Sequence, residues 1–125
     1  MVVLLVLTGV ISLGGKSDED EVRSIVHRGV ETFNTRDFRG AYDLLSPTEK
    51  AECSFEDYQG LMNSVLSAVD GQAIDARNIR VEVDTNEAIA SYDLYVGDDF
   101  LTHSVDDVYM KEGGRWYDFD EDDSC

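Results

Sequence analysis

The spacing of apolar residues changes once along this chain, and that change limits the folds open to it. Up to Val69 the apolar residues recur at steps of three and four, as in helices with one buried face. From Ile79 they alternate with polar residues, as in strands with one buried face. Helices followed by an antiparallel meander, without a repeat or linker, predict a single α+β domain, and 125 residues allow one modest core.

The expected architecture is three N-terminal helices packed on a curved, four-stranded antiparallel sheet. Acidic residues at 18–20 favour a helix start, and "SPTE" at Ser46 and "SFED" at Ser54 are N-cap signals. The expected strands run over residues 79–83, 88–96, 102–111 and 115–120. The Glu112-Gly113-Gly114 turn joins the last two strands into a hairpin that carries the only tryptophan.

The first 16 residues have a different character from the rest. Residues 2–13 are almost wholly apolar, too few for a comfortable membrane span but long enough for the apolar part of a signal peptide. We therefore expect residues 1–16 to be a signal or membrane-anchor segment and residues 17–125 to be the folded domain with an acidic tail. The expected location is outside the cell or on the outer face of its membrane.

The charge of the chain excludes several partners. It carries 27 Asp and Glu against 10 Lys and Arg, a formal net charge of -17. We therefore do not expect the domain to bind nucleic acid or an anionic membrane surface. The only membrane contact that we expect is through the apolar N-terminal segment. Asp outnumbers Glu and Arg outnumbers Lys. Both a protein of a salt-loving organism and an ordinary acidic secreted protein fit this bias.

Two cysteines, Cys53 and Cys125, fit an exported chain. One disulfide between them would tie the acidic tail to the helical half and would stabilise the fold by roughly 3–5 kcal/mol in the chain-entropy model. The alternative is a buried Cys53 and a free Cys125. Neither cysteine has a partner at metal-ligand spacing, so a metal site is not expected. The sequence also contains no Gly-rich phosphate loop and no nucleotide fingerprint, and no cofactor is expected.

Two stretches of the sequence together resemble a known superfamily. They are "VRSIVHRGVETFNTRDFRGAYDLLSP" and the final hairpin "VYMKEGGRWYDFD", separated by a further helix and strands. This arrangement is similar to the nuclear transport factor 2-like superfamily, which includes ketosteroid isomerase and SnoaL-like cyclases. The resemblance implies a cone-shaped, cystatin-like roll with a pocket at its open end, and homodimers are common in the superfamily. Because this fold hosts enzymes, binding proteins and dimerisation modules, it does not imply a function.

Enzymes of this superfamily use Asp, His and Tyr in the cone, so these residues need separate consideration. His103 and Asp107 would share one face of a regular strand and could orient one another as an acid–base pair. The alternative for His103 is a strand histidine that faces water or a dimer partner. Asp43, Asp93 and Asp107 lie in otherwise apolar patterns, but with 17 Asp in the chain solvated surface acids are the default.

Aromatic residues complete the candidate pocket. Tyr42, Tyr58, Tyr92 and Tyr95 could donate hydrogen bonds to an oxyanion, and Trp116 lies in the last hairpin, where its default role is packing. The residues that we select as pocket candidates are Tyr42, Tyr58, Tyr95, His103 and Trp116. The tail motif at Asp118, Asp120 and Asp122 lacks the glycine and glutamate of a calcium loop, so it is expected to be solvated.

The sequence thus favours a small exported or membrane-tethered domain with a binding or accessory role and without catalysis. Its partner would be a small apolar ligand or another protein. The alternative is an isomerase, dehydratase or cyclase of the ketosteroid isomerase or SnoaL type that acts on a small apolar molecule.

Overall fold

The computed structural model describes residues 17–119, apart from the side chains of residues 102–104. The helices and strands, in chain order, are α1 (Asp18–Asn34), α2 (Phe38–Tyr42), α3 (Pro47–Glu52), α4 (Phe55–Ala68), β2 (Ile74–Asp84), β3 (Glu87–Val96), β4 (Asp99–Glu112) and β5 (Arg115–Phe119). The predicted division into residues 1–16 and 17–125 stays a prediction, because both ends of the chain lie outside the described residues.

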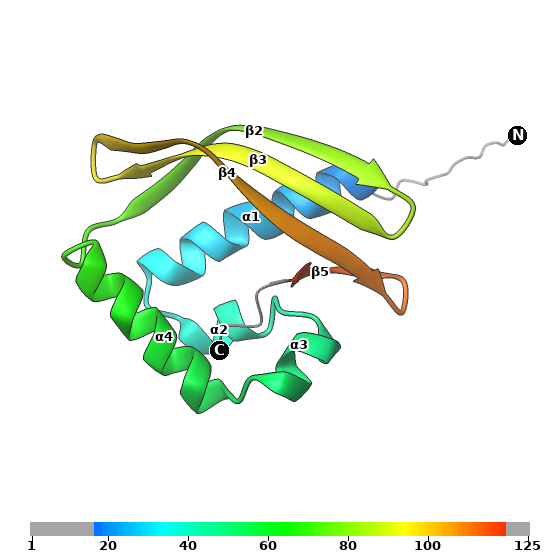
Figure 1. Cartoon of the computed structure of the whole chain (residues 1–125), viewed down its shortest axis with the longest axis horizontal. Coiled ribbons are helices and arrows are strands. Elements are labelled where there is room, and N and C mark those ends of the chain that lie inside the picture. The colour runs from blue at the N-terminus through cyan, green and yellow to red at the C-terminus, as the bar shows by residue number, and fades with distance from the viewer. Residues whose placement is uncertain (1–16, 120–125) are drawn as a thin grey trace, which may run out of the picture.

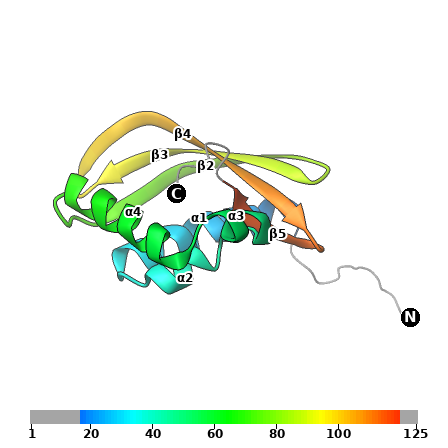
Figure 2. The ribbon, with the colours of Figure 1, turned by 60° about the horizontal axis from the view of Figure 1, so that its bottom comes forward.

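The helices lie against one face of a single antiparallel sheet, whose strand order is β2-β3-β4-β5 (Figures 1 and 2). This arrangement confirms the α+β class that the change of period predicts. The core between the two layers holds residues from α1 and from the inner face of the sheet. Its buried members are Val22, Ile25, Val26, Ala76, Ala88, Ala90, Tyr109 and Trp116.

The described part of the chain has four helices where we expected three, because each capping residue starts a helix of its own. The side chains of Ser17, Asp37, Ser46 and Ser54 each accept a hydrogen bond from a backbone amide three residues later. Pro47 then takes the first position of α3, where its missing amide costs no hydrogen bond. Five- and six-residue helices cannot stand alone, so packing must hold α2 and α3 in place.

Three two-residue turns join the four strands. The cross-strand pairs that close them are Asp84–Glu87, Val96–Asp99 and Glu112–Arg115. In the last turn Gly113 and Gly114 both have positive φ, 59° and 83°. That pair of values is typical of a type I′ turn, which only glycine and a few polar residues adopt easily.

The outer edge of β5 is covered by the segment after α2. The Asp118 amide donates to the Leu44 carbonyl at 2.8 Å, and the Ser46 amide donates to the Asp118 carbonyl at 3.1 Å. These bonds form a short parallel bridge between Leu45 and Asp118. The bridge therefore fixes the backbone of Asp118 between β4 and the helical layer.

Trp116 anchors the last hairpin to the start of α1. It is 4% exposed, and its indole N–H donates to Asp18 Oδ1 at 3.0 Å. The Lys111 ammonium donates to the same oxygen at 3.3 Å. This hydrogen bond from Trp116 is the main reason why the pKa of Asp18 lies below its usual value. Trp116 thus packs in the core and holds the last hairpin against α1, which agrees with the packing role expected for it.

The sheet is bent where two strands depart from regular pairing. On β2 two residues, Asn78 and Ile79, lie between the pairs Arg77–Asp93 and Arg80–Ser91, whereas on β3 only Tyr92 does. Asn78 has a φ of 57°, a left-handed conformation that asparagine tolerates. On its other side β3 pairs with β4 through further shifts, between Tyr92 and Tyr95. Such bulges bend a strand, and here they curve the sheet around the inner side of Tyr92.

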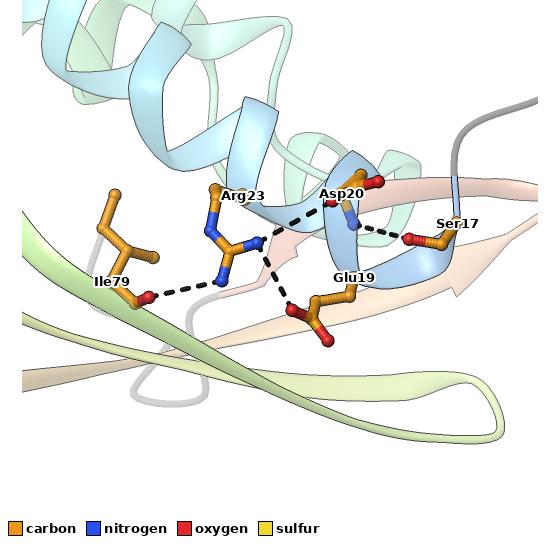
Figure 3. A network of polar contacts seen from close by, with 5 residues as sticks. All are labelled: Ser17, Glu19, Asp20, Arg23 and Ile79. Carbon is orange, nitrogen blue, oxygen red and sulfur yellow. Dashed lines mark hydrogen bonds and ion pairs between the residues drawn. The ribbon is translucent and has the colours of Figure 1, made fainter.

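Arg23 of α1 supports the bulge in β2 (Figure 3). Its guanidinium donates to the Ile79 carbonyl at 3.3 Å and forms an ion pair with Glu19 at 3.3 Å. A second acid, Asp20, lies 3.8 Å from the same guanidinium nitrogen. The first helix is therefore attached to the sheet at the point where β2 leaves its regular ladder.

Candidate functional site

A cavity of about 250 Å³ lies between the helices and the inner face of the sheet. Its apolar wall comes from α1, α2, α4 and the loop after α2, and strands β2 and β3 add one residue each. The apolar lining residues are Ile25, Val26, Val30, Phe33, Ala41, Leu44, Met62, Ile74 and Leu94. Gly29 completes this wall on α1.

The polar lining consists of three tyrosines and two aspartates. Tyr92, Asp107, Tyr109 and Asp118 come from β3, β4 and β5, and Tyr58 reaches the cavity from α4. Positions 107 and 109 are two apart on β4, so both side chains point inward, and Asp118 is directly opposite Tyr109 on β5. The strand alternation thus collects these side chains on one side of the cavity.

One hydrogen bond organises the polar side. The Tyr92 hydroxyl donates to Asp107 Oδ2 at 2.5 Å. Asp107 pairs across the ladder with Ala90, which is fully buried and small. Because alanine fills little space beside the carboxyl group, the longer Tyr92 side chain can reach Asp107 from its position further along β3.

The tyrosines of the cavity hold their protons strongly. Burial and the charge of Asp118 raise the pKa of Tyr58 to about 12. Burial is also the first cause of the raised pKa of Tyr92 and of Tyr109, and both aspartates add to it. All three hydroxyls therefore remain neutral near pH 7, where they can donate and accept hydrogen bonds.

Of the residues predicted to line a pocket, Tyr58 does line the cavity. Tyr42 lies behind Tyr58, with ring centroids 5.5 Å apart, and its hydroxyl donates to the Cys53 carbonyl at 2.6 Å. Tyr95 follows Leu94 and points to the opposite face of β3, where the Arg77 guanidinium lies 4.0 Å from its ring centroid. Trp116 is buried at the α1 contact instead of lining the cavity.

Of the predicted pair of His103 and Asp107, one member belongs to the cavity. Asp107 lines the cavity, whereas the side chain of His103 lies outside the described residues. The pairing of β4 with β3 shifts between Val105 and Thr102, so regular alternation cannot be extended from Asp107 to His103. The histidine's role stays a prediction.

Two polar lining residues, Asp118 and Tyr109, were not predicted from the sequence as part of a pocket. Asp118 was counted with the solvated tail, although it follows Trp116 by two positions and so shares its inward face. Tyr109 is 2% exposed and lies two positions after Asp107 on β4, so the two side chains share a face of the strand. An acid two positions after a buried tryptophan was the signal that could have found Asp118.

The remaining predictions concern the two cysteines, metal ions and contact with a membrane. Cys53 is 3% exposed and is not a free thiol, but Cys125 lies outside the described residues, so their pairing stays a prediction. Within residues 17–119, no group of three His, Cys, Asp or Glu side chains is arranged to hold a metal ion. No helix in that range is long and apolar enough to cross a membrane.

Comparison with solved structures identifies the architecture. A protein of unknown function with a cystatin-like fold from Nostoc punctiforme superposes with a TM-score of 0.61 at 14% identity, over 81% of this chain and 85% of that one. An NTF2-like protein of unknown function from Pseudomonas putida gives 0.59 at 16% identity, over 83% and 84%. The fold is the cystatin-like, NTF2-like one.

A third similar structure carries a functional name. It is a candidate dehydratase of the NTF2-like family from Streptomyces avermitilis, with a TM-score of 0.50 at 14% identity, over 79% of this chain and 89% of that one. No family model and no curated protein matches the sequence. At such low identities the NTF2-like similarity establishes the fold and not the function.

Proposed function

We propose that this NTF2-like domain binds a small, largely apolar molecule in its cavity without transforming it. The observation that carries the proposal is a cavity with apolar walls and a group of convergent polar side chains on one side. Ligand sites have this composition, because apolar walls supply affinity and a few polar groups fix orientation. At about 30 Å³ for each water molecule, the cavity has room for roughly eight waters, so the ligand must be compact.

Gly29 supports the proposal through what it leaves empty. It lies in the middle of α1 and lines the cavity, and a Cβ built on it would meet nothing within 4 Å. Glycine in a helix interior costs about 1 kcal/mol relative to alanine. A glycine that lowers the stability of α1 but keeps the cavity open is expected if the cavity binds a ligand.

Gly29→Leu tests the proposal directly. Its side chain should enter the cavity and abolish binding of small apolar molecules, while the helix gains propensity and the fold is kept. Gly60→Leu is the matched control, because Gly60 is an exposed glycine of α4 with equally free space around its Cβ. A fragment screen by ligand-observed NMR would compare both variants with the parent chain. Equal binding by all three proteins, or by none, would contradict the proposal.

The proposed setting is the one that the N-terminal sequence favours. Residues 1–16 would export the domain or tether it to the outer face of a membrane, where the cavity would serve an accessory or carrier role. Homodimer formation also stays a prediction, on which the binding proposal does not depend.

A catalytic alternative rests on the hydrogen bond between Tyr92 and Asp107 beside Asp118. Neutral tyrosines and carboxylates are the groups with which an acid–base isomerase or dehydratase would move a proton. Once a ligand is found, its incubation with the protein in D₂O separates the two functions. Deuterium that enters carbon positions with the parent chain and not with Asp107→Asn would establish catalysis. Binding without exchange is the result expected here.

A further inference from the structure

Helix α4 is loosely packed, although one of its faces is apolar, and it lies at the margin of the helical layer (Figure 1). Apolar side chains recur along it at steps of three and four, which puts them on one face: Tyr58, Leu61, Met62, Val65, Leu66 and Val69. None of the residues of α4, all of which the structure describes, is buried, whereas α1 has several buried residues. Tyr58 and Met62 line the cavity. The apolar face of α4 therefore borders the cavity instead of a packed core.

The two ends of α4 are attached to the rest of the helical layer. Near its start, the ring of Tyr58 lies 5.5 Å from the ring of Tyr42 on α2, centroid to centroid. Just after its end, the Arg36 guanidinium donates to the Gly71 carbonyl at 2.9 Å. Among the described residues, no hydrogen bond or ion pair joins residues 60–68 to another helix or strand. This stretch is therefore held at its ends and not along its length.

The sequence of the same stretch adds little helix stability of its own. It contains five of the weaker helix formers: Gly60, Asn63, Ser64, Val65 and Ser67. The last turn has no basic residue, and Asp70 places a negative charge beyond the C-terminal end, where the helix dipole disfavours it. Because short helices depend on tertiary packing, opening residues 60–68 should cost much less free energy than unfolding the domain.

We propose that residues 60–68 of α4 are the gate of the cavity: they open while α1 and the sheet stay folded, and this opening admits the ligand. Asp70 and Gly71 have φ values of 54° and 70°, so the chain turns sharply after α4, and Arg36 holds that turn in place. An occupant of the cavity would give Met62 a packing partner and would favour the closed state. The inference adds control of access to the proposed function, but the gate can be tested without a ligand.

Amide hydrogen exchange of the full chain tests whether the gate opens by itself. Gly29→Ala strengthens α1 and Gly60→Ala strengthens α4, and a Cβ at either position meets nothing within 4 Å. Each variant should slow the exchange of the most protected β3 amides ~5-fold, which is the difference in helix propensity between glycine and alanine expressed as an equilibrium constant. The amides of the gate should also slow ~5-fold with Gly60→Ala, but they should not change with Gly29→Ala.

Gly29→Ala is the deciding variant, because α1 stays folded whether the gate is open or closed. A stronger α1 therefore cannot change the equilibrium between the open and closed gate. If Gly29→Ala slows the gate amides as much as those of β3, the gate opens only when the whole domain unfolds, and the inference is wrong.

A cysteine placed in the cavity tests whether the gate is the entrance. Ala41 lines the cavity from α2 and is 7% exposed. The thiol of Ala41→Cys should react with iodoacetamide ~5-fold more slowly when Gly60→Ala is added, and at an unchanged rate when Gly29→Ala is added. The parent chain is the blank, since Cys53 is not a free thiol. Val30→Cys, on the α1 wall of the cavity, repeats the measurement if Ala41→Cys does not fold.

The outcomes distinguish the gate from the function that it would serve. A labelling rate that does not respond to Gly60→Ala would mean that small molecules enter by another route, and would overturn the inference even if Gly29→Leu abolishes binding. If the exchange and labelling rates respond as expected, the gate is established. Binding by Gly29→Leu equal to that of the parent chain would then contradict the proposed function alone.

Discussion

At the scale of single residues, burial in the cavity changes the acid–base properties of its tyrosines. Tyr92 would be a simple strand tyrosine if its hydroxyl did not reach Asp107. Tyr58 comes from a helix, yet the charge of Asp118 acts on its hydroxyl too. Because burial and negative charge act in the same direction, the neutral hydroxyl of each tyrosine is favoured over its ionised form.

The raised pKa of Tyr58 predicts how stability changes in alkaline solution. In the unfolded chain a tyrosine ionises near pH 10, whereas in the folded chain Tyr58 keeps its proton up to about pH 12. Above pH 10 the unfolded state therefore binds fewer protons than the folded state, and the free energy of unfolding falls as pH rises. For Tyr58 alone this loss is at most about 2–3 kcal/mol between pH 10 and pH 12.

Tyr58→Phe isolates that contribution. The variant should lose stability less steeply than the parent chain above pH 10, and comparison at pH 7 measures the separate cost of removing the hydroxyl. Urea unfolding at a series of pH values gives both slopes. Parallel slopes for the two proteins would show that the Tyr58 hydroxyl is not held in its neutral form by the fold.

At the scale of elements, the bulge of β2 decides the shape of the cavity. The extra residue lies opposite Tyr92, so the bend is centred on a residue that lines the cavity. Arg23 of α1 satisfies the Ile79 carbonyl in the irregular part of β2. The helix thus supports the sheet at the place where its own ladder is weakest.

Arg23→Ala is expected to lower the free energy of unfolding by about 1–2 kcal/mol, because the Ile79 carbonyl loses a charged donor. Arg28→Ala is the matched control, since Arg28 is an exposed residue of the same helix and its loss changes the net charge equally. Urea unfolding measures the stability of both variants. NMR shifts of the Tyr92 amide should change in the first variant alone, and an equal effect of both would contradict a specific role for Arg23.

These elements also explain how far the sequence could predict the structure. The helix caps and the type I′ turn each depend on a few residues that are close together in the sequence. The helix starts and the last hairpin could therefore be predicted from the sequence. The start of β2 at Ile74 was missed because the bulge at Asn78 interrupts the alternation on which strand prediction depends. Asp118 was missed because it was assigned to the acidic tail, although its spacing of two from Trp116 indicated the inward face. The bridge to Leu45 that holds its backbone joins distant segments, so local patterns could not predict that contact.

At the scale of the whole molecule, the excess of acids opposes folding. A net charge of -17 on 125 residues is brought closer together when the chain becomes compact. The ion pairs formed by Arg23, Lys50, Arg77 and Lys111 counter it only in part, and the side chains in these pairs are at least 30% exposed. Exposed pairs contribute little, typically 0–1 kcal/mol each. The repulsion must therefore be offset by the core or by ions in solution.

Salt should therefore stabilise the domain strongly. Raising NaCl from 0.1 to 1 M shortens the Debye length from about 10 to about 3 Å, which screens repulsion between surface carboxylates. We expect Tm to rise by at least about 5 °C, which corresponds to roughly 1 kcal/mol for a domain of this size. Sucrose is the control, because it favours compact states by exclusion from the protein surface without screening charge. If Tm is insensitive to NaCl, or follows sucrose equally, repulsion among the acids does not limit stability, and the resemblance of the composition to proteins of salt-loving organisms has no physical consequence.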